Sequence, residues 1–92
     1  MPLNNAHLKK KAEAFVQTIE KRSEKQKNAP AHGTLANDYN QLRKLTAEQN
    51  PELVAILPPT ATLYNSVSGQ QYSHESYDDI CTFCQQIVNL LP

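Results

Sequence analysis

The chain has 92 residues, of which 39% are hydrophobic, and its nine basic residues balance its nine acidic ones. This length suffices for one domain with a single modest core, and the apolar content is too high for a disordered chain. The longest apolar run, residues 53–57, is far shorter than the roughly 18 to 20 residues of a membrane-spanning helix. Lys9, Lys10 and Lys11 also stand where a signal peptide has its apolar stretch, so we expect a cytoplasmic protein.

The first predicted helix spans residues 5–27. Its apolar residues recur at the spacing of one helical face: Leu8, Ala12, Phe15 and Ile19. Asn4 or Asn5 can cap the helix start. Because the apolar face ends at Ile19, we expect the end of the helix to be a polar tip that projects past the core and frays near Ala29.

A linker and a second helix follow. Residues 28–33 are predicted to be the linker because they contain Pro30 and Gly33. The helix is predicted over residues 35–49, with Thr34 as its cap. Its apolar residues share one face: Leu35, Tyr39 and Leu42.

The middle of the chain carries the weakest signals. Asn50 and Pro51 are typical of a helix start, and the apolar residues after them predict a short buried helix: Leu53, Val54, Ile56 and Leu57. Residues 60–73 fit either a short helix or a small hairpin that turns near Gly69. We favour the helix because an isolated two-stranded hairpin is marginally stable in water.

The last predicted helix spans residues 77–91. Ser76 can cap it, and Asp79 completes a capping-box pattern three residues later. Its apolar residues form a wide face that predicts the most buried element: Tyr77, Ile80, Cys81, Cys84, Ile87, Val88 and Leu91. We therefore predict an all-α single domain over residues 1–92, a bundle of three longer helices plus one or two short ones. The alternative is an α+β fold with a small hairpin near residues 60–73.

Cys81 and Cys84 form a C-x-x-C pair, a pattern found in redox and zinc sites. In a redox motif the first cysteine stands at a helix start, where the helix dipole stabilises the thiolate, whereas Cys81 falls inside a predicted helix on its core face. A structural zinc requires two further ligands, and the three histidines form no second pair: His7, His32 and His74. We expect both cysteines to pack in the core, in preference to redox chemistry or a metal site, and we expect no cofactor.

His74, Glu75 and Ser76 place an imidazole, a carboxylate and a hydroxyl in succession, which are the groups of a catalytic triad. No nucleophile elbow, glycine-rich turn or oxyanion signature accompanies them. Ser76 is better used as a helix cap. We therefore predict that the protein is not an enzyme.

Charge is distributed unevenly along the chain. Residues 1–28 carry a net charge of +4 and residues 51–92 carry −4. Four lysines lie on one flank of the first predicted helix, Lys10, Lys11, Lys21 and Lys25, and three of them are predicted to contact a partner: Lys10, Lys21 and Lys25. Such a flank can contact phosphates, but the same helix interleaves its lysines with glutamates, which disfavours nucleic acid. We expect these lysines to engage an acidic protein partner or the acidic part of a second copy in a homodimer.

Tyr64 and Tyr72 flank a loop of serine, asparagine, glycine and glutamine residues, a composition typical of protein-recognition surfaces. With the three lysines they form the predicted interaction surface. We interpret the chain as a non-enzymatic protein–protein interaction module, such as an adaptor, a regulator or an immunity-type binder. The alternative is a nucleic-acid-associated protein that uses the basic face of the first helix, and no membrane partner is expected.

Overall fold

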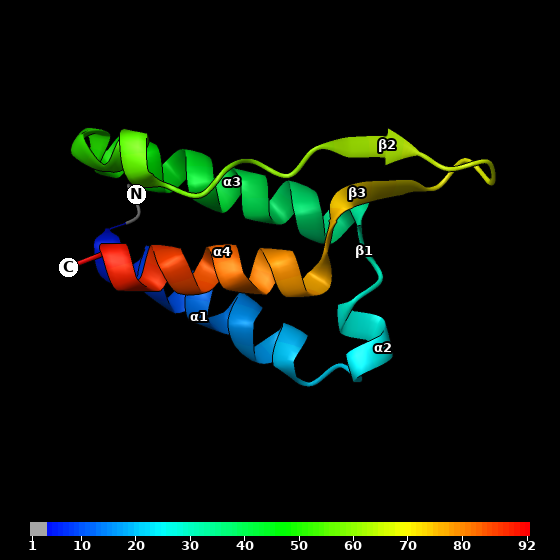
Figure 1. Ribbon diagram of the computed structural model, residues 1–92. Coiled ribbons are helices and arrows are strands. Elements are labelled where there is room, and N and C mark those ends of the chain that lie inside the picture. Colours follow the sequence, from blue (N-terminus) through cyan, green and yellow to red (C-terminus); the bar gives the residue numbers. More distant parts are fainter. Residues whose placement is uncertain (1–3) are drawn as a thin grey trace.

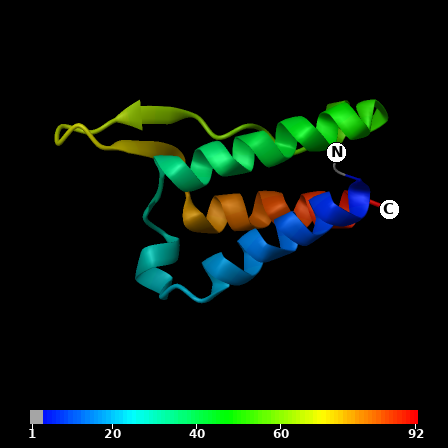
Figure 2. The ribbon, with the colours of Figure 1, turned by 180° about the vertical axis from the view of Figure 1, so that it is seen from behind.

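Three helices lie side by side in the computed structural model, which describes residues 4–92 (Figure 1). They are α1 (Asn5–Glu20), α3 (Gly33–Gln49) and α4 (Tyr77–Leu90). The chain runs along α1 in one direction and along α3 and α4 in the other, so that residues near the two ends of the chain lie at the same end of the bundle (Figures 1 and 2). The most extensive contact between elements joins α1 to α4. No described helix is both long and apolar enough to cross a membrane.

The core forms where the apolar faces of these three helices meet. Its members on the helices are Leu8, Ala12, Ile19, Ala36, Tyr39, Leu42, Ile80, Cys81, Cys84 and Ile87. Most of these residues lie on the faces that the sequence predicted, but Ala36 was not predicted, and four residues of the predicted faces are only half-buried: Phe15, Leu35, Tyr77 and Val88. Tyr39 is fully buried, and its hydroxyl donates a hydrogen bond of 2.7 Å to the carbonyl oxygen of Pro59. The polar end of this large side chain is therefore satisfied inside the core.

The three longer helices predicted from the sequence are present and the protein is mostly helical, but the predicted all-α class is corrected to α+β by a small three-stranded antiparallel sheet. Its strands are β1 (Pro30–His32), β2 (Leu63–Asn65) and β3 (Gln71–Ser76), in the order β1-β3-β2. The helix favoured over residues 60–73 is therefore wrong and the alternative hairpin is correct. The predicted linker at residues 28–33 instead contains β1. This third strand, together with packing of the sheet on α3, stabilises a hairpin that would be marginal alone.

The hairpin turn owes its geometry to Gly69. The N–H of Gly69 donates to the carbonyl of Ser66 at 2.9 Å, and the N–H of Ser66 donates to the carbonyl of Gln70 at 2.7 Å. Gly69 has φ = 86°, a conformation open to glycine, whereas among residues 4–92 no other residue type has a positive φ. This is the pattern of a three-residue hairpin loop that closes on a glycine bulge.

The first helix is shorter than predicted. Asn4 caps α1 as expected, accepting a hydrogen bond from the N–H of His7, but α1 ends at Glu20 rather than near residue 27. Ser23 then caps a separate short helix, α2 (Glu24–Lys27), in a reciprocal capping box with Gln26. A serine that bonds to the backbone in this way favours a new helix start over continuation of the old one. The predicted polar tip is therefore a separate turn.

The segment after α3 is also arranged differently from the prediction. A 3-10 helix, η1 (Pro51–Ile56), replaces the short buried helix, and its residues Val54 and Ile56 are 49% and 59% exposed. Leu57 is buried and ends this turn. Residues 57–62 then run extended beside α3, where the side chain of Asn40 donates to the carbonyl of Ala61 and accepts from its N–H. This extended run leads into β2.

Candidate functional site

Tyr64 and Tyr72, both predicted as interaction residues, are direct partners across β2 and β3, with ring centroids 6.3 Å apart. Two histidines join them. The ring of His74 lies 4.7 Å from that of Tyr64, and the ring of His32 lies 5.7 Å from that of Tyr72 in an edge-to-face arrangement. We call these four side chains, His32, Tyr64, Tyr72 and His74, the ring face. It combines side chains from all three strands.

Strand alternation explains why the rings share one side of the sheet. Successive side chains on a strand point to opposite faces, so Tyr72 and His74 point one way and Ser73 points the other. Ser73 is fully buried, while His32 and His74 are exposed and the two tyrosines are half-buried. The hydroxyl of Ser73 donates to the Glu75 carboxylate at 3.0 Å. The rings therefore lie on the outer face of a sheet whose inner face is packed.

Hydrogen bonds orient two of the rings. Nδ1 of His32 accepts the N–H of Thr34 at 3.2 Å, so His32, rather than the predicted Thr34, caps α3. The hydroxyl of Tyr72 donates to the side-chain oxygen of Gln70 at 2.8 Å. The capping bond occupies one of the two imidazole nitrogens of His32. Across residues 4–92 no group of three or more histidine, cysteine or acidic side chains is placed to hold a metal ion.

The sequence indicated the tyrosines of the ring face but missed its histidines. His74 could have been recognised, because it follows Tyr72 by two residues and a strand places such residues on one face. His32 could not, because it precedes its ring partner Tyr72 by 40 residues. Only the pairing of β1 with β3 brings those two rings together.

The three predicted lysines do not form one ridge. Lys10 lies on α1, Lys21 follows the end of α1, and Lys25 lies on α2 beyond the break at Ser23. All three lysines are exposed. The basic flank inferred from one continuous helix is therefore divided.

Cys81 and Cys84 are free, buried and part of the core, as predicted. Burial raises the pKa of the Cys84 thiol from its ordinary 9.0 to about 12, with a smaller contribution from Cys81. The pKa of the Cys81 thiol is also raised, mainly by burial and to a smaller extent by the negative charges of Glu20 and Asp78. Both thiols are therefore protonated at neutral pH, and the reactive thiolate of a redox cysteine is disfavoured.

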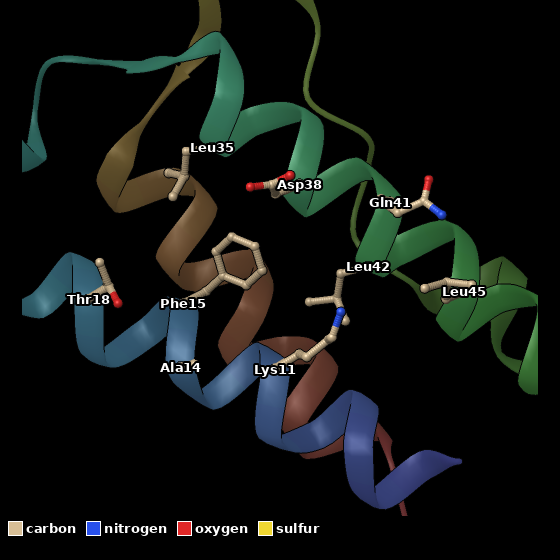
Figure 3. Close-up of a pocket in the computed structure, with 9 residues that line it drawn as sticks. All are labelled: Lys11, Ala14, Phe15, Thr18, Leu35, Asp38, Gln41, Leu42 and Leu45. Atoms are coloured by element: carbon tan, nitrogen blue, oxygen red, sulfur yellow. The ribbon is translucent and has the colours of Figure 1, made fainter. Parts of the chain in front are cut away.

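A second surface feature is a groove of about 440 Å³ between α1 and α3. Figure 3 shows the Phe15 ring standing between the two helices, with Lys11 on α1 and Asp38 on α3. Leucines of α3 complete the apolar part of the lining: Leu35, Leu42 and Leu45. Phe15, Leu35 and Leu45 are half-buried, so the groove retains apolar surface that α4 does not cover. The sequence pattern did not predict this groove.

No protein-family model, no curated protein and no solved structure shows significant similarity to the chain. Its function is therefore inferred from the geometry of the ring face.

Proposed function

We propose that the protein is a non-enzymatic protein–protein interaction module and that the ring face is its recognition surface. The observation that carries the proposal is the gathering of four aromatic and imidazole side chains from three strands on the outer side of a small sheet. Rings that served only the fold would be expected to point into the core. Tyrosine supplies a large and rigid contact area at low cost in side-chain entropy, which is why it is enriched in binding surfaces.

The setting of the ring face supports recognition of another macromolecule. The β2–β3 hairpin extends beyond the ends of the helices, and its turn carries the fully exposed Val67 (Figure 1). Gln70, whose side-chain oxygen accepts the hydrogen bond from the Tyr72 hydroxyl, places an exposed amide beside the rings. Rigid aromatic anchors next to adaptable polar groups are typical of a protein-binding surface.

Nucleic acid is the competing ligand, because exposed rings on a sheet can also stack on unpaired bases. Such surfaces combine stacking with cationic groups that contact phosphates. The chain has no lysine or arginine after Lys44, and residues 51–92 carry a net charge of −4. This distribution of charge favours a protein partner at the ring face. A nucleic-acid ligand would reveal itself by an affinity that falls steeply with salt.

Site-specific photo-crosslinking of the full chain tests the proposal. A photoreactive phenylalanine analogue at position 64 should capture a defined protein from the native host, and the same analogue at Gln86, exposed on α4, should not. The captured protein, once purified, should bind the Tyr64→Ala, Tyr72→Ala double variant at least about tenfold more weakly than wild type. Replacing both tyrosines by phenylalanine keeps the rings and should largely preserve binding. Equal capture from both positions, capture of nucleic acid alone, or unchanged affinity of the alanine variant would refute the proposal.

A further inference from the structure

Hydrogen bonds on both sides of β2 show which of its backbone groups face β3. The N–H of His74 donates to the carbonyl of Thr62 at 2.9 Å, and the N–H of Ser66 donates to the carbonyl of Gln70 at 2.7 Å. Alternate residues of an antiparallel strand bond to the same neighbouring strand. The even-numbered residues from 62 to 66 therefore direct their backbone groups toward β3.

The odd-numbered residues of β2, Leu63 and Asn65, direct their backbone groups away from β3. Their two N–H and two carbonyl groups lie along the outer edge of the sheet, where β2 is the last strand. No described segment covers this edge (Figures 1 and 2), and residues 4–92 supply no hydrogen bond to these four groups. An extended backbone carries donors and acceptors at the matching spacing, so the edge suits a further strand.

The opposite edge of the sheet, formed by β1, is less suited to a further strand. Pro30 has no N–H to donate, and the N–H of His32 donates to the hydroxyl of Tyr77 at 3.2 Å. Sheet edges are commonly protected by lysine, by proline or by a bulge. The sequence of β2, Leu-Tyr-Asn, contains neither of those residues, and its pairing with β3 is regular over all three positions. The sheet can therefore be extended at β2.

We propose that the protein binds an extended segment of its partner as a further strand on the outer edge of β2. This inference rests on the function proposed above and specifies the form of the partner. An antiparallel segment pairs two of its residues with Leu63 and Asn65, and each pair exchanges two hydrogen bonds. The segment residue between them lies opposite Tyr64 on the same side of the sheet, so its side chain contacts the ring face.

Charge distinguishes a different protein from a second copy of this chain. Residues 51–92 carry a net charge of −4, and the Glu75 carboxylate bonds to the N–H of Thr62, directly before β2. Pairing of β2 with the β2 of a second copy would bring two such acidic regions together, which is unfavourable. A segment that contains lysine or arginine complements this region. The occupant is therefore an extended, basic segment of another protein.

Selection from a displayed library of random nine-residue peptides, with the full chain as target, tests the inference. The selected peptides should contain more lysine and arginine than aspartate and glutamate. They should bind Asn65→Pro at least about tenfold more weakly than Asn65→Ala. Both substitutions remove the same side chain, but only proline removes the outward N–H, and proline is tolerated at a sheet edge. The alanine variant is therefore the matched control.

Amide hydrogen exchange measured by NMR on the wild-type chain avoids any effect of proline on folding. Saturation with a selected peptide should slow exchange at the N–H groups of Leu63 and Asn65 at least about tenfold, because both become hydrogen-bonded. The N–H of Tyr64 faces β3 in the free chain and should change less.

Three results would overturn the inference: no peptide that binds below about 1 mM, equal binding to the proline and alanine variants, or unchanged exchange at Leu63 and Asn65. Slowed exchange at these positions in the chain alone as its concentration rises, with a dimer in sedimentation, would assign the edge to a second copy and overturn it as well.

The edge inference and the proposed function can fail separately. A protein captured from position 64 that binds Asn65→Pro as tightly as Asn65→Ala would preserve the recognition function and refute binding at the edge. Peptides that protect the edge but bind the Tyr64→Ala, Tyr72→Ala variant as tightly as wild type would preserve the edge inference and refute the ring face as the recognition surface.

Discussion

The guanidinium carbon of Arg22 lies 4.1 Å from the centroid of the Tyr77 ring, which joins the chain just after α1 to the first residue of α4. The hydroxyl oxygen of the same tyrosine accepts a hydrogen bond of 3.2 Å from the N–H of His32 in β1. Tyr77 therefore links three segments that are distant in the sequence. Among the described residues, Nε of Arg22 is buried and has no hydrogen-bond partner, which leaves the ring as its principal contact.

Loss of this cation–π contact should weaken the fold. We expect Arg22→Ala to lower the free energy of unfolding by about 1 to 2 kcal/mol, because the cation–π interaction and the packing of the side chain are lost together. Urea denaturation measures the change. Lys21→Ala, at an exposed neighbouring position, should cost less than about 0.5 kcal/mol. Equal effects of the two substitutions would show that the contact with Tyr77 does not stabilise the protein.

The two glycines should respond to alanine for different reasons. A Cβ on Gly33 would lie 2.9 Å from both the Cβ and the carbonyl oxygen of Gln71, so Gly33→Ala must push β3 away from the start of α3. We expect a loss of roughly 1 to 3 kcal/mol. A Cβ on Gly69 meets nothing within 4 Å, but the positive φ costs about 1 to 2 kcal/mol for alanine.

Asparagine substitutions at both glycines, compared with the alanine variants by thermal unfolding, distinguish the cost of a positive φ from the cost of crowding. Gly69→Asn should be tolerated better than Gly69→Ala, because asparagine adopts a positive φ more readily. At Gly33, asparagine should be at least as harmful as alanine, since crowding rather than φ is limiting there. The reverse order at either position would contradict the assigned cause.

The cysteines should prove structural. We expect Cys81→Ala and Cys84→Ala each to lower the free energy of unfolding by roughly 1 to 2 kcal/mol through lost packing, as measured by urea denaturation. Both thiols should react slowly with a thiol reagent in the native state and rapidly in urea, because both are buried. Zinc that survives dialysis against a weak chelator and disappears in both variants would contradict a purely structural role.

Stability should fall at high pH. Burial raises the pKa of Cys84 from 9.0 to about 12, so the native state keeps a proton that the unfolded chain releases above pH 9. The stability contributed by this group is fully present below pH 9 and is lost as the pH rises toward 12, by up to about 1.4 kcal/mol per pH unit. Burial, with a smaller contribution from Cys84, also raises the pKa of Tyr39 above its ordinary 10.0, which steepens the loss above pH 10.

Urea titrations at pH 8, 9, 10 and 11 measure this dependence. In Cys84→Ala the decline between pH 9 and 10 should be shallower than in wild type, because the most strongly shifted thiol is gone. Its stability should still decline above pH 10 as the unfolded chain ionises at Tyr39. A wild-type protein whose free energy of unfolding stays constant from pH 8 to 11 would contradict the burial of both groups.

Local sequence determined the three long helices, and it also determined where two of them, α1 and α4, begin. The apolar face of α4 and its Ser76–Asp79 capping box lie within one segment, as do Asn4 and the first turns of α1, so short-range spacing is sufficient to place them. The placement of both cysteines in the core follows from the same face of α4. The sequence also contained a signal for the break at Ser23, because Ser23 and Gln26 have the spacing of a capping box. The charged residues around them favour a helix, so the periodicity predicted one continuous helix instead.

Tertiary structure alone decided the sheet, the ring face and the groove. A strand as short as β1 has no periodicity to recognise, and its hydrogen bonds are made with β3, 40 or more residues away. The contact of His32 with Tyr72 depends on that pairing, and the groove depends on how far apart α1 and α3 pack. Helical hydrogen bonds close within four residues and leave a local pattern in the sequence, whereas strand pairing and helix packing join segments whose relative positions no local pattern encodes.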